Sequence, residues 1–144
     1  MKTRRHIAHA TASSGSTLPP WRVDLRAGHH PLVADEPASE GGGDTGTSPF
    51  GLVVSGLAAC TAMTLRMYAD RKGWELSGID VDIHYDIDEE GNASFARTVA
   101  VPGDLDPAQR QRLAEIAERT PVTLALRHGT PIATVFTSMD VDGE

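Results

Sequence analysis

The 144-residue sequence predicts an α+β domain in which antiparallel sheets pack around one long central helix. Two stretches alternate apolar and polar residues with the period of two that is typical of half-buried strands. Between them lies a long, largely apolar stretch that carries the signals of a helix start and a helix end. Strands therefore precede and follow one dominant helix, an order that favours the α+β class.

The N-terminal part predicts strands. We expect an edge strand at residues 6–11 and a second strand at residues 21–26, where Trp21, Val23 and Leu25 alternate with charged residues. Residues 31–34 return as a partner strand after a turn that contains Gly28. Residues 1–20 are expected to form a flexible or edge-strand arm. Residues 35–47, which are rich in glycine and acids, are predicted to be a surface loop.

The central helix is predicted to run from Ser48 to about Lys72. Ser48 suits the N-cap, Pro49 suits the first helical position, and Gly73 is a typical end signal. The middle of this helix is apolar on all sides, which is normal for a buried helix. Residues 45–65 approach the length of a membrane span, but they contain too many Gly, Ser, Thr and Pro residues. We therefore expect a core helix that is covered by sheet, by a partner subunit, or by both.

A hairpin follows the helix. Ile79, Val81, Ile83, Tyr85 and Ile87 alternate with acids and one histidine, and residues 93–101 keep the alternation after a turn at residues 89–92.

Two further helical segments and a last strand complete the prediction. Asp106 and Pro107 open a helix. Because Pro121 disfavours helical geometry in the residue before it, this helix should break at Thr120 and restart. Residues 132–139 are expected to form the final strand.

Composition excludes several classes of function. The net charge is −7, from 13 Lys and Arg against 20 Asp and Glu, so neither nucleic acid nor an anionic membrane is an expected partner. A single cysteine rules out an internal disulfide, which favours the cytoplasm. Residues 6–20 lack the apolar core of a secretory signal. We expect one domain spanning residues 1–144.

The central motif resembles the OsmC/Ohr family. The residues that carry the resemblance are His30–Pro37, Gly46–Pro49 and Ala58–Leu65, the last of which includes Cys60. The resemblance extends over most of residues 21–139 in element order. It implies an intertwined α+β homodimer whose sites lie between subunits and reduce organic hydroperoxides. In typical members a reactive cysteine on the long helix works with a resolving cysteine, an arginine and a glutamate.

Cys60 is the one candidate catalytic residue, and we expect it to be buried. Free cysteines are often inert core residues. Cys60 lies too far beyond Pro49 for the helix dipole to favour a thiolate, so a cation must come from elsewhere. Arg22 and Arg26 are the candidate donors, although either one alone is more typical of a solvated strand face.

Two other residues that the resemblance leads us to expect are missing, the acid and the resolving cysteine. The positions that should carry the acid hold Phe50 and Gly51, and the position of the resolving cysteine holds Thr120. An oxidised Cys60 would therefore depend on an external thiol or a second subunit.

Two hypotheses follow from these differences. The first is a one-cysteine hydroperoxide reductase of oxidative-stress defence, with an organic hydroperoxide and an external thiol as partners. The second is a catalytically degenerate homodimer that binds a small apolar ligand at the subunit interface. We expect no cofactor and no metal in either case.

Other motifs are weaker. His6 and His9 would point to opposite faces of a strand, and His29 with His30 is more typical of a solvated turn. The Gly41–Gly43 stretch lacks the lysine of a phosphate-binding loop and is interpreted as a flexible loop. An acidic row on the predicted hairpin is more typical of a solvated face than of a site; its members are Asp80, Asp82, Asp86 and Asp88.

Overall fold

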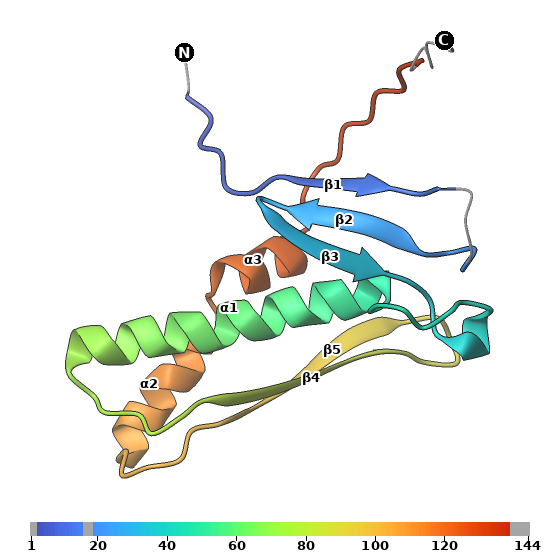
Figure 1. Cartoon of the computed structure of the whole chain (residues 1–144). Helices are drawn as coiled ribbons and strands as arrows, with labels where there is room; N and C mark the ends of the chain where they lie inside the picture. Colours follow the sequence, from blue (N-terminus) through green and yellow to red (C-terminus); the bar gives the residue numbers. More distant parts are fainter. Residues whose placement is uncertain (1–2, 16–18, 139–144) are drawn as a thin grey trace.

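A computed structural model of the chain describes residues 3–15 and 19–138. The elements are β1 (Ala10–Ser13), β2 (Val23–Ala27), β3 (His30–Ala34), the 3-10 helix η1 (Ala38–Glu40), α1 (Pro49–Lys72), β4 (Asp80–Ile87), β5 (Ala93–Ala100), α2 (Pro107–Ala117) and α3 (Pro121–His128). The β1-β2-β3 sheet, the β4-β5 hairpin and the shorter helices lie around α1, the longest element (Figure 1). This α+β arrangement confirms the predicted fold class.

The strands form two antiparallel sheets. The first has the order β1-β2-β3 and the second is the β4-β5 hairpin. The edge strand predicted at residues 6–11 begins only at Ala10, because Ala10 pairs with Ala27 at the very end of β2. Beyond this pair the His9 carbonyl accepts the N–H of Gly28 in the turn at 3.0 Å. The hairpin follows the prediction closely, with Val81 opposite Val99 and Tyr85 opposite Phe95.

Helix α1 has the predicted caps. The Ser48 hydroxyl accepts the Gly51 N–H at 3.0 Å, and Pro49 occupies the first helical position. Gly73 ends the helix in the left-handed region at φ 72°, a conformation that glycine adopts without steric cost. The sequence signals at both ends of the long helix are therefore confirmed.

The kinked second helix is also confirmed. Asp106 and Gln109 form a reciprocal capping box at the start of α2. The helix stops before Thr120, whose side chain accepts the Thr123 N–H and caps α3. Leu113 and Ala117 of α2 pack with Leu65 of α1 to form the buried core cluster.

One predicted strand is wrong. Residues 132–138 form no strand, and the remaining predicted residue, Met139, lies outside the described residues. Figure 1 shows this segment running away from the body of the molecule after α3. Its apolar side chains are almost fully exposed, at 90% for Ile132 and 97% for Phe136. The segment has the apolar character of a strand, but within the described chain no strand lies alongside it to accept its hydrogen bonds.

Only one face of α1 is covered by the chain itself. Its partners are β4, α2 and α3, and the residues buried against them are Leu57, Thr61, Leu65 and Ala69. Met63 and Met67 are 59% and 55% exposed. By length and composition α1 also satisfies the criteria for a membrane span, as core helices of soluble proteins often do. Other apolar residues of α1, among them Leu52, Val53 and Val54, are only partly buried.

The loop before α1 is fixed by a buried carboxylate. Asp35 is 2% exposed and accepts the Glu36 N–H at 2.8 Å, the Thr45 N–H at 3.1 Å and the Thr45 hydroxyl at 2.7 Å. The same segment is tied to the start of α1, because the Asp35 N–H donates to the Thr47 carbonyl at 3.0 Å. The loop predicted to be flexible is thus held by specific bonds.

These bonds make stability depend on pH. The Thr45 hydroxyl holds the pKa of Asp35 below its ordinary value of 3.8, against the opposing effect of burial. The pKa of Asp35 is therefore lower in the folded protein than in the unfolded chain. The carboxylate stabilises the fold fully at pH values above the unfolded-state pKa, and this stabilisation is lost as the pH falls through the folded-state pKa. We predict that Asp35→Asn lowers the urea midpoint most at neutral pH, and that the difference from wild type shrinks below about pH 4.

The control for this experiment is Asp44→Asn, which changes a carboxylate in the same loop. Asp44 has φ 53°, a conformation that asparagine also tolerates. A constant difference between wild type and Asp35→Asn from neutral to acidic pH would contradict the role given to the carboxylate.

Candidate functional site

Cys60 lies half-buried on a flank of α1. This corrects the prediction of a buried cysteine. The reason is geometric: the covered stripe of α1 runs through Thr61, and Cys60, the residue before it, is rotated by about 100° around the helix axis. Its sulfur has a polar neighbour on the following turn, the Thr64 hydroxyl, with Sγ and Oγ1 3.9 Å apart.

Of the two predicted cation donors, Arg22 lies just before β2 and Arg26 lies in β2, and both are exposed. Arg22 pairs with Asp24 at 3.2 Å, and its side chain is 41% exposed. Arg26 donates to the His29 carbonyl at 3.4 Å. Within the described residues neither guanidinium bonds to Cys60. The chain by itself therefore does not assemble the cysteine–arginine pair that the sequence suggested.

The position of the missing acid is occupied by an aromatic cluster. The Phe50 ring stacks on Tyr85 with centroids 4.5 Å apart, and Tyr85 contacts Phe95 at 4.8 Å. At Gly51 a Cβ atom would collide with the Thr47 hydroxyl. An acidic side chain at that second position would thus require Thr47 to move. At the start of α1, Phe50 therefore packs against an aromatic ring, and the backbone of Gly51 lies close to the Thr47 hydroxyl.

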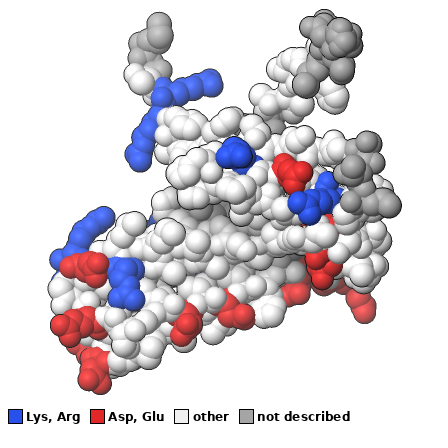
Figure 2. All heavy atoms as spheres, in the orientation of Figure 1, with Lys and Arg blue, Asp and Glu red and all other residues white. Residues whose placement is uncertain are grey.

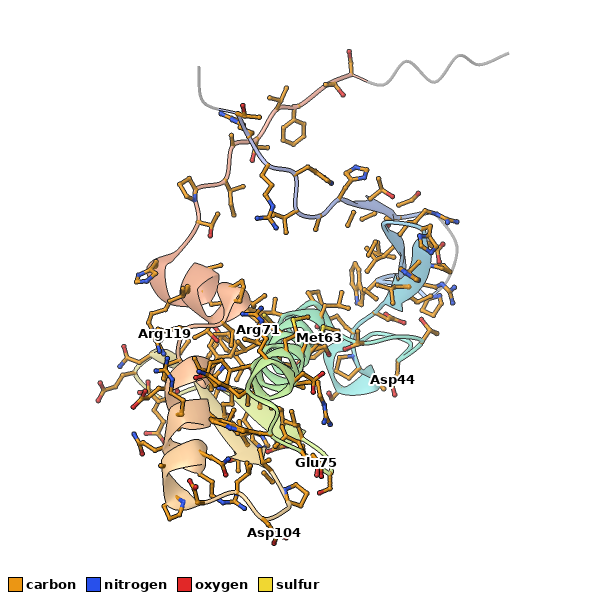
Figure 3. The ribbon with its side chains drawn as sticks, turned by 90° about the vertical axis from the view of Figure 1, so that its left-hand side faces the viewer. Asp44, Met63, Arg71, Glu75, Asp104 and Arg119 are labelled. Atoms are coloured by element: carbon orange, nitrogen blue, oxygen red, sulfur yellow. The ribbon has the colours of Figure 1, made fainter. Side chains whose placement is uncertain are left out.

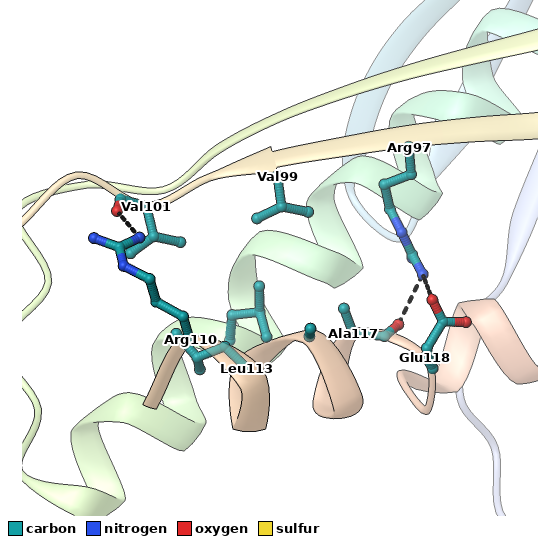
Figure 4. Close-up of a pocket in the computed structure, with 9 residues that line it drawn as sticks. Arg97, Val99, Val101, Arg110, Leu113, Ala117 and Glu118 are labelled. Carbon is teal, nitrogen blue, oxygen red and sulfur yellow. Dashed lines mark hydrogen bonds and ion pairs between the residues drawn. The ribbon is translucent and has the colours of Figure 1, made fainter. Parts of the chain in front are cut away.

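Sequence reasoning missed the main polar feature of the core, which is Arg97 of β5. Its side chain is 13% exposed, and Nη1 donates to the hydroxyls of Thr61 at 3.0 Å and Thr123 at 2.9 Å. Nη2 donates to the Ala117 carbonyl at 2.9 Å and lies 3.8 Å from a Glu118 oxygen. Figure 4 shows Arg97 reaching from β5 to Ala117 and Glu118. One guanidinium joins β5, α1 and the end of α2.

A signal for Arg97 was present in the sequence. The predicted inward face of the second hairpin strand contains Phe95, Val99 and Val101, and Arg97 is the charged residue at the intervening position of that face. It lies opposite Ile83 in the hairpin. A charge at an inward-facing strand position needs buried partners. Those partners are threonines distant in sequence, so the pattern alone did not identify them.

Thr120 belongs to the same network. It is fully buried, its hydroxyl lies 2.6 Å from that of Thr123, and it caps α3. Thr123 in turn accepts a hydrogen bond from Arg97. The residue at the family's resolving-cysteine position therefore has a structural role here.

The remaining candidates do not form sites. His6 and His9 are exposed, and the His29 and His30 rings face each other in the β2–β3 turn at 4.1 Å. The acidic row of β4 is exposed, with His84 bonded to Asp82 at 3.0 Å. In the part of the chain that the structure describes, no three His, Cys, Asp or Glu side chains gather closely enough to hold a metal ion.

Removal of the Arg97 guanidinium should lower the free energy of unfolding strongly. Arg97→Met removes the hydrogen bonds that the guanidinium donates to two buried hydroxyls and to the Ala117 carbonyl, so we expect a loss of about 2 kcal/mol or more in the free energy of unfolding. Arg22→Met removes only an exposed ion pair, and its cost should stay below about 1 kcal/mol. Urea unfolding of both variants at one protein concentration measures the difference. Equal effects would show that the buried guanidinium does not hold these elements together.

The comparisons with known proteins agree with this geometry. No curated protein matches the sequence at a significant level. Among solved structures, the chain is similar to an osmotic stress induced and detoxification response protein of Psychrobacter arcticus 273-4, with 14% identity and a TM-score of 0.70 over 85% of this chain and 90% of that one. An organic hydroperoxide resistance protein of Legionella pneumophila gives 21% identity and a TM-score of 0.64, over 87% and 92%.

A third structure is closer in sequence. The organic hydroperoxide resistance protein OhrB of Bacillus subtilis is 28% identical, with a TM-score of 0.58 over 85% of this chain and 91% of that one. A model of the OsmC-like protein family matches residues 41–135. Because this match covers well over half of the chain and includes α1, the hairpin and both later helices, the chain belongs to the family of OsmC-like proteins.

Proposed function

We propose that this chain is a thiol-dependent reductase of organic hydroperoxides that acts as a homodimer through Cys60. Its family includes organic hydroperoxide resistance proteins, among them the structures from Legionella pneumophila and Bacillus subtilis. The observation that carries the proposal is the position of Cys60, the only cysteine, on a half-exposed flank of α1. A lone cysteine with no internal disulfide partner suits a reducing cytoplasm.

The chemistry needs one sulfur and an external reductant. The Cys60 thiolate attacks the O–O bond, so that sulfur is oxidised to a sulfenic acid while the peroxide is reduced and leaves as an alcohol. A thiol then condenses with the sulfenic acid, releasing water and leaving a mixed disulfide. A second thiol releases the reduced Cys60 and departs as a disulfide. Thr120 has no sulfur, so this chain cannot complete the cycle internally.

Several exposed features support the homodimer. The flank of α1 that contains Met63 and Met67 is uncovered, and the outer edges of β1, β4 and β5 pair with no other strand within the described chain. The extended segment after α3 exposes Ile132 and Phe136. A second copy would bury the apolar flank and provide strand edges for the extended segment.

A second candidate function is supported by the start of α1. Phe50 is part of an aromatic stack, and a Cβ atom at Gly51 would require the Thr47 hydroxyl to move. Neither position carries the acid that orients the arginine in typical members. This arrangement favours a homodimer that binds a small apolar ligand without reducing it. A related protein of Vibrio cholerae, 22% identical, has captopril bound in one of its active sites.

Oxidation of Cys60 distinguishes the two functions. We predict that cumene hydroperoxide converts Cys60 to a sulfenic acid, detected by mass spectrometry as one dimedone adduct per chain. Because the chain has a single cysteine, the adduct needs no further mapping. Cys60→Ser, which keeps the size and polarity of the side chain, is the control and should give no adduct. A folded protein that gives no adduct with excess hydroperoxide would sink the reductase proposal and leave the ligand-binding function.

A further inference from the structure

Two neighbouring cavities adjoin at the ion pair of Arg97 and Glu118. The first, of about 310 Å³, lies between β5 and α2, and the second, of about 340 Å³, lies between β5, α1 and α3. Arg97 and Glu118 line both of them. Figure 4 shows the first cavity, with Arg97 and Val99 pointing from β5 toward α2. The same two side chains therefore form the boundary between the cavities.

Both cavities lie across α1 from the flank that a second copy is proposed to cover. Leu65 lines the first cavity and Leu57 the second, and both belong to the buried stripe of α1. Met63 and Met67 are each two residues from Leu65, which is a rotation of about 200° around the helix axis. Figure 3 shows Met63 on the side of α1 that faces away from α2. A second copy that covers this flank therefore does not cover the cavities.

The walls of both cavities are largely apolar. The first is lined by Leu65, Val99 and Leu113 among others, and the second by Leu57 and Phe95. Small-molecule sites in proteins are typically concave and apolar, with a few polar groups that fix the orientation of the ligand. Here the polar groups gather where the two cavities adjoin. A fitting ligand therefore has an apolar body and one polar end.

The junction is cationic although the chain is acidic. The net charge of the chain is −7, and carboxylates follow the hairpin side of the molecule in Figure 2. The lining of the two cavities instead contains three arginines and one carboxylate, which are Arg97, Arg110, Arg127 and Glu118. This excess of positive charge favours an anionic group at the polar end of the ligand.

Glu118 marks the position that a ligand anion would take. Its carboxylate pairs with Arg127 and lies 3.8 Å from Nη2 of Arg97. The side chains of Glu118 and Arg127 are both half-exposed, and such surface pairs contribute little to stability. The protein's own carboxylate can therefore leave this position at small cost. Its presence between two guanidinium groups shows that the position fits a carboxylate.

Arg97 has a donor left for a ligand. Nη1 donates to the hydroxyls of Thr61 and Thr123, and Nη2 donates to the Ala117 carbonyl. Nη2 carries a second N–H group. Within the described chain this group makes no hydrogen bond, because Glu118 at 3.8 Å is too distant. A ligand carboxylate that approached more closely would accept it in a charge-assisted bond.

We propose that the two cavities form one binding site for a small carboxylic acid with an apolar body. The carboxylate replaces that of Glu118 between Arg97 and Arg127, and the apolar body lies in the cavity between β5 and α2. Cys60 lines neither cavity, so the site does not depend on the proposed reductase chemistry. Cys60→Ser should accordingly bind the acid as tightly as the wild type does.

A matched pair of ligands tests the charge of the site. 4-Phenylbutyrate and 4-phenylbutan-1-ol share their apolar body and differ in the charge of the end group. We predict that the acid binds about tenfold more tightly than the alcohol in isothermal titration calorimetry, as expected for one hydrogen bond between charged groups. Equal affinities, or no binding of the acid at millimolar concentration, would overturn the proposal.

Variants at the junction identify the charges. Glu118→Gln removes the competing carboxylate and should raise the affinity for the acid about threefold, while Arg127→Gln should lower it about threefold, as expected for exposed ion pairs. Neither should change the affinity for the alcohol. Arg119→Gln is the control, because Arg119 follows Glu118 but lines the cavity between α1 and α2. An acid affinity that Arg127→Gln leaves unchanged would contradict the proposed position of the carboxylate.

A substitution at the mouth of the first cavity tests the place of the apolar body. Ala114 is exposed and lines this cavity, so Ala114→Leu should fill it and weaken the binding of both ligands at least fivefold, roughly the effect of losing one buried apolar contact. Ala108→Leu is the matched control, since Ala108 is exposed on the same helix and lines neither cavity. Unchanged binding in Ala114→Leu would show that the ligand lies elsewhere and would overturn the assignment.

Discussion

The structure depends on how the apolar surface of α1 is covered. This helix provides the sulfur, the main core residues and the contacts of β4, α2 and α3. Within the chain only the stripe of Leu57, Thr61, Leu65 and Ala69 is buried. Burial of apolar surface stabilises by roughly 25 cal/mol per Å², so the uncovered flank is a large unused source of stability. The position of Cys60 at the border of the covered stripe follows directly from this partial coverage.

Arg97 imposes a second constraint, because a charged group inside a small core must have all its partners in place. The partners come from α1, from the end of α2 and from α3. Thr120 contributes through Thr123, so the residue that replaces a sulfur in this chain is part of the same network. Thr120 thus gives this network a hydroxyl at the position where the family resemblance implies a resolving cysteine. This arrangement explains why recycling of Cys60 is assigned to an external thiol.

Much of the fold was predictable because its signals are local. Ser48, Gly73 and Asp106 cap helices by bonding to backbone groups that are close in sequence. The alternation of apolar and polar residues in the β4-β5 hairpin indicates which face of the hairpin the same chain covers. The exposed segment at residues 132–138 was not predictable in the same way, since strand-like composition does not say where the hydrogen-bonding partner is. Cys60 was expected to be buried because the middle of α1 is apolar on all sides. Composition alone does not show how much of the surface of this helix a single chain covers. The partners of Arg97 depend on tertiary contacts that no spacing reveals.

The central claim is that a second copy of the chain covers the flank of α1 beside Cys60. Sedimentation equilibrium of the wild type and of Met63→Glu tests it most directly, with Ala108→Glu on the exposed side of α2 as the control. We expect a dimer for the wild type and for the control. Met63→Glu should shift the protein to monomer, because the substitution places a charge in the interface. A wild type that stays monomeric at micromolar concentration and above would show that no second copy covers this flank.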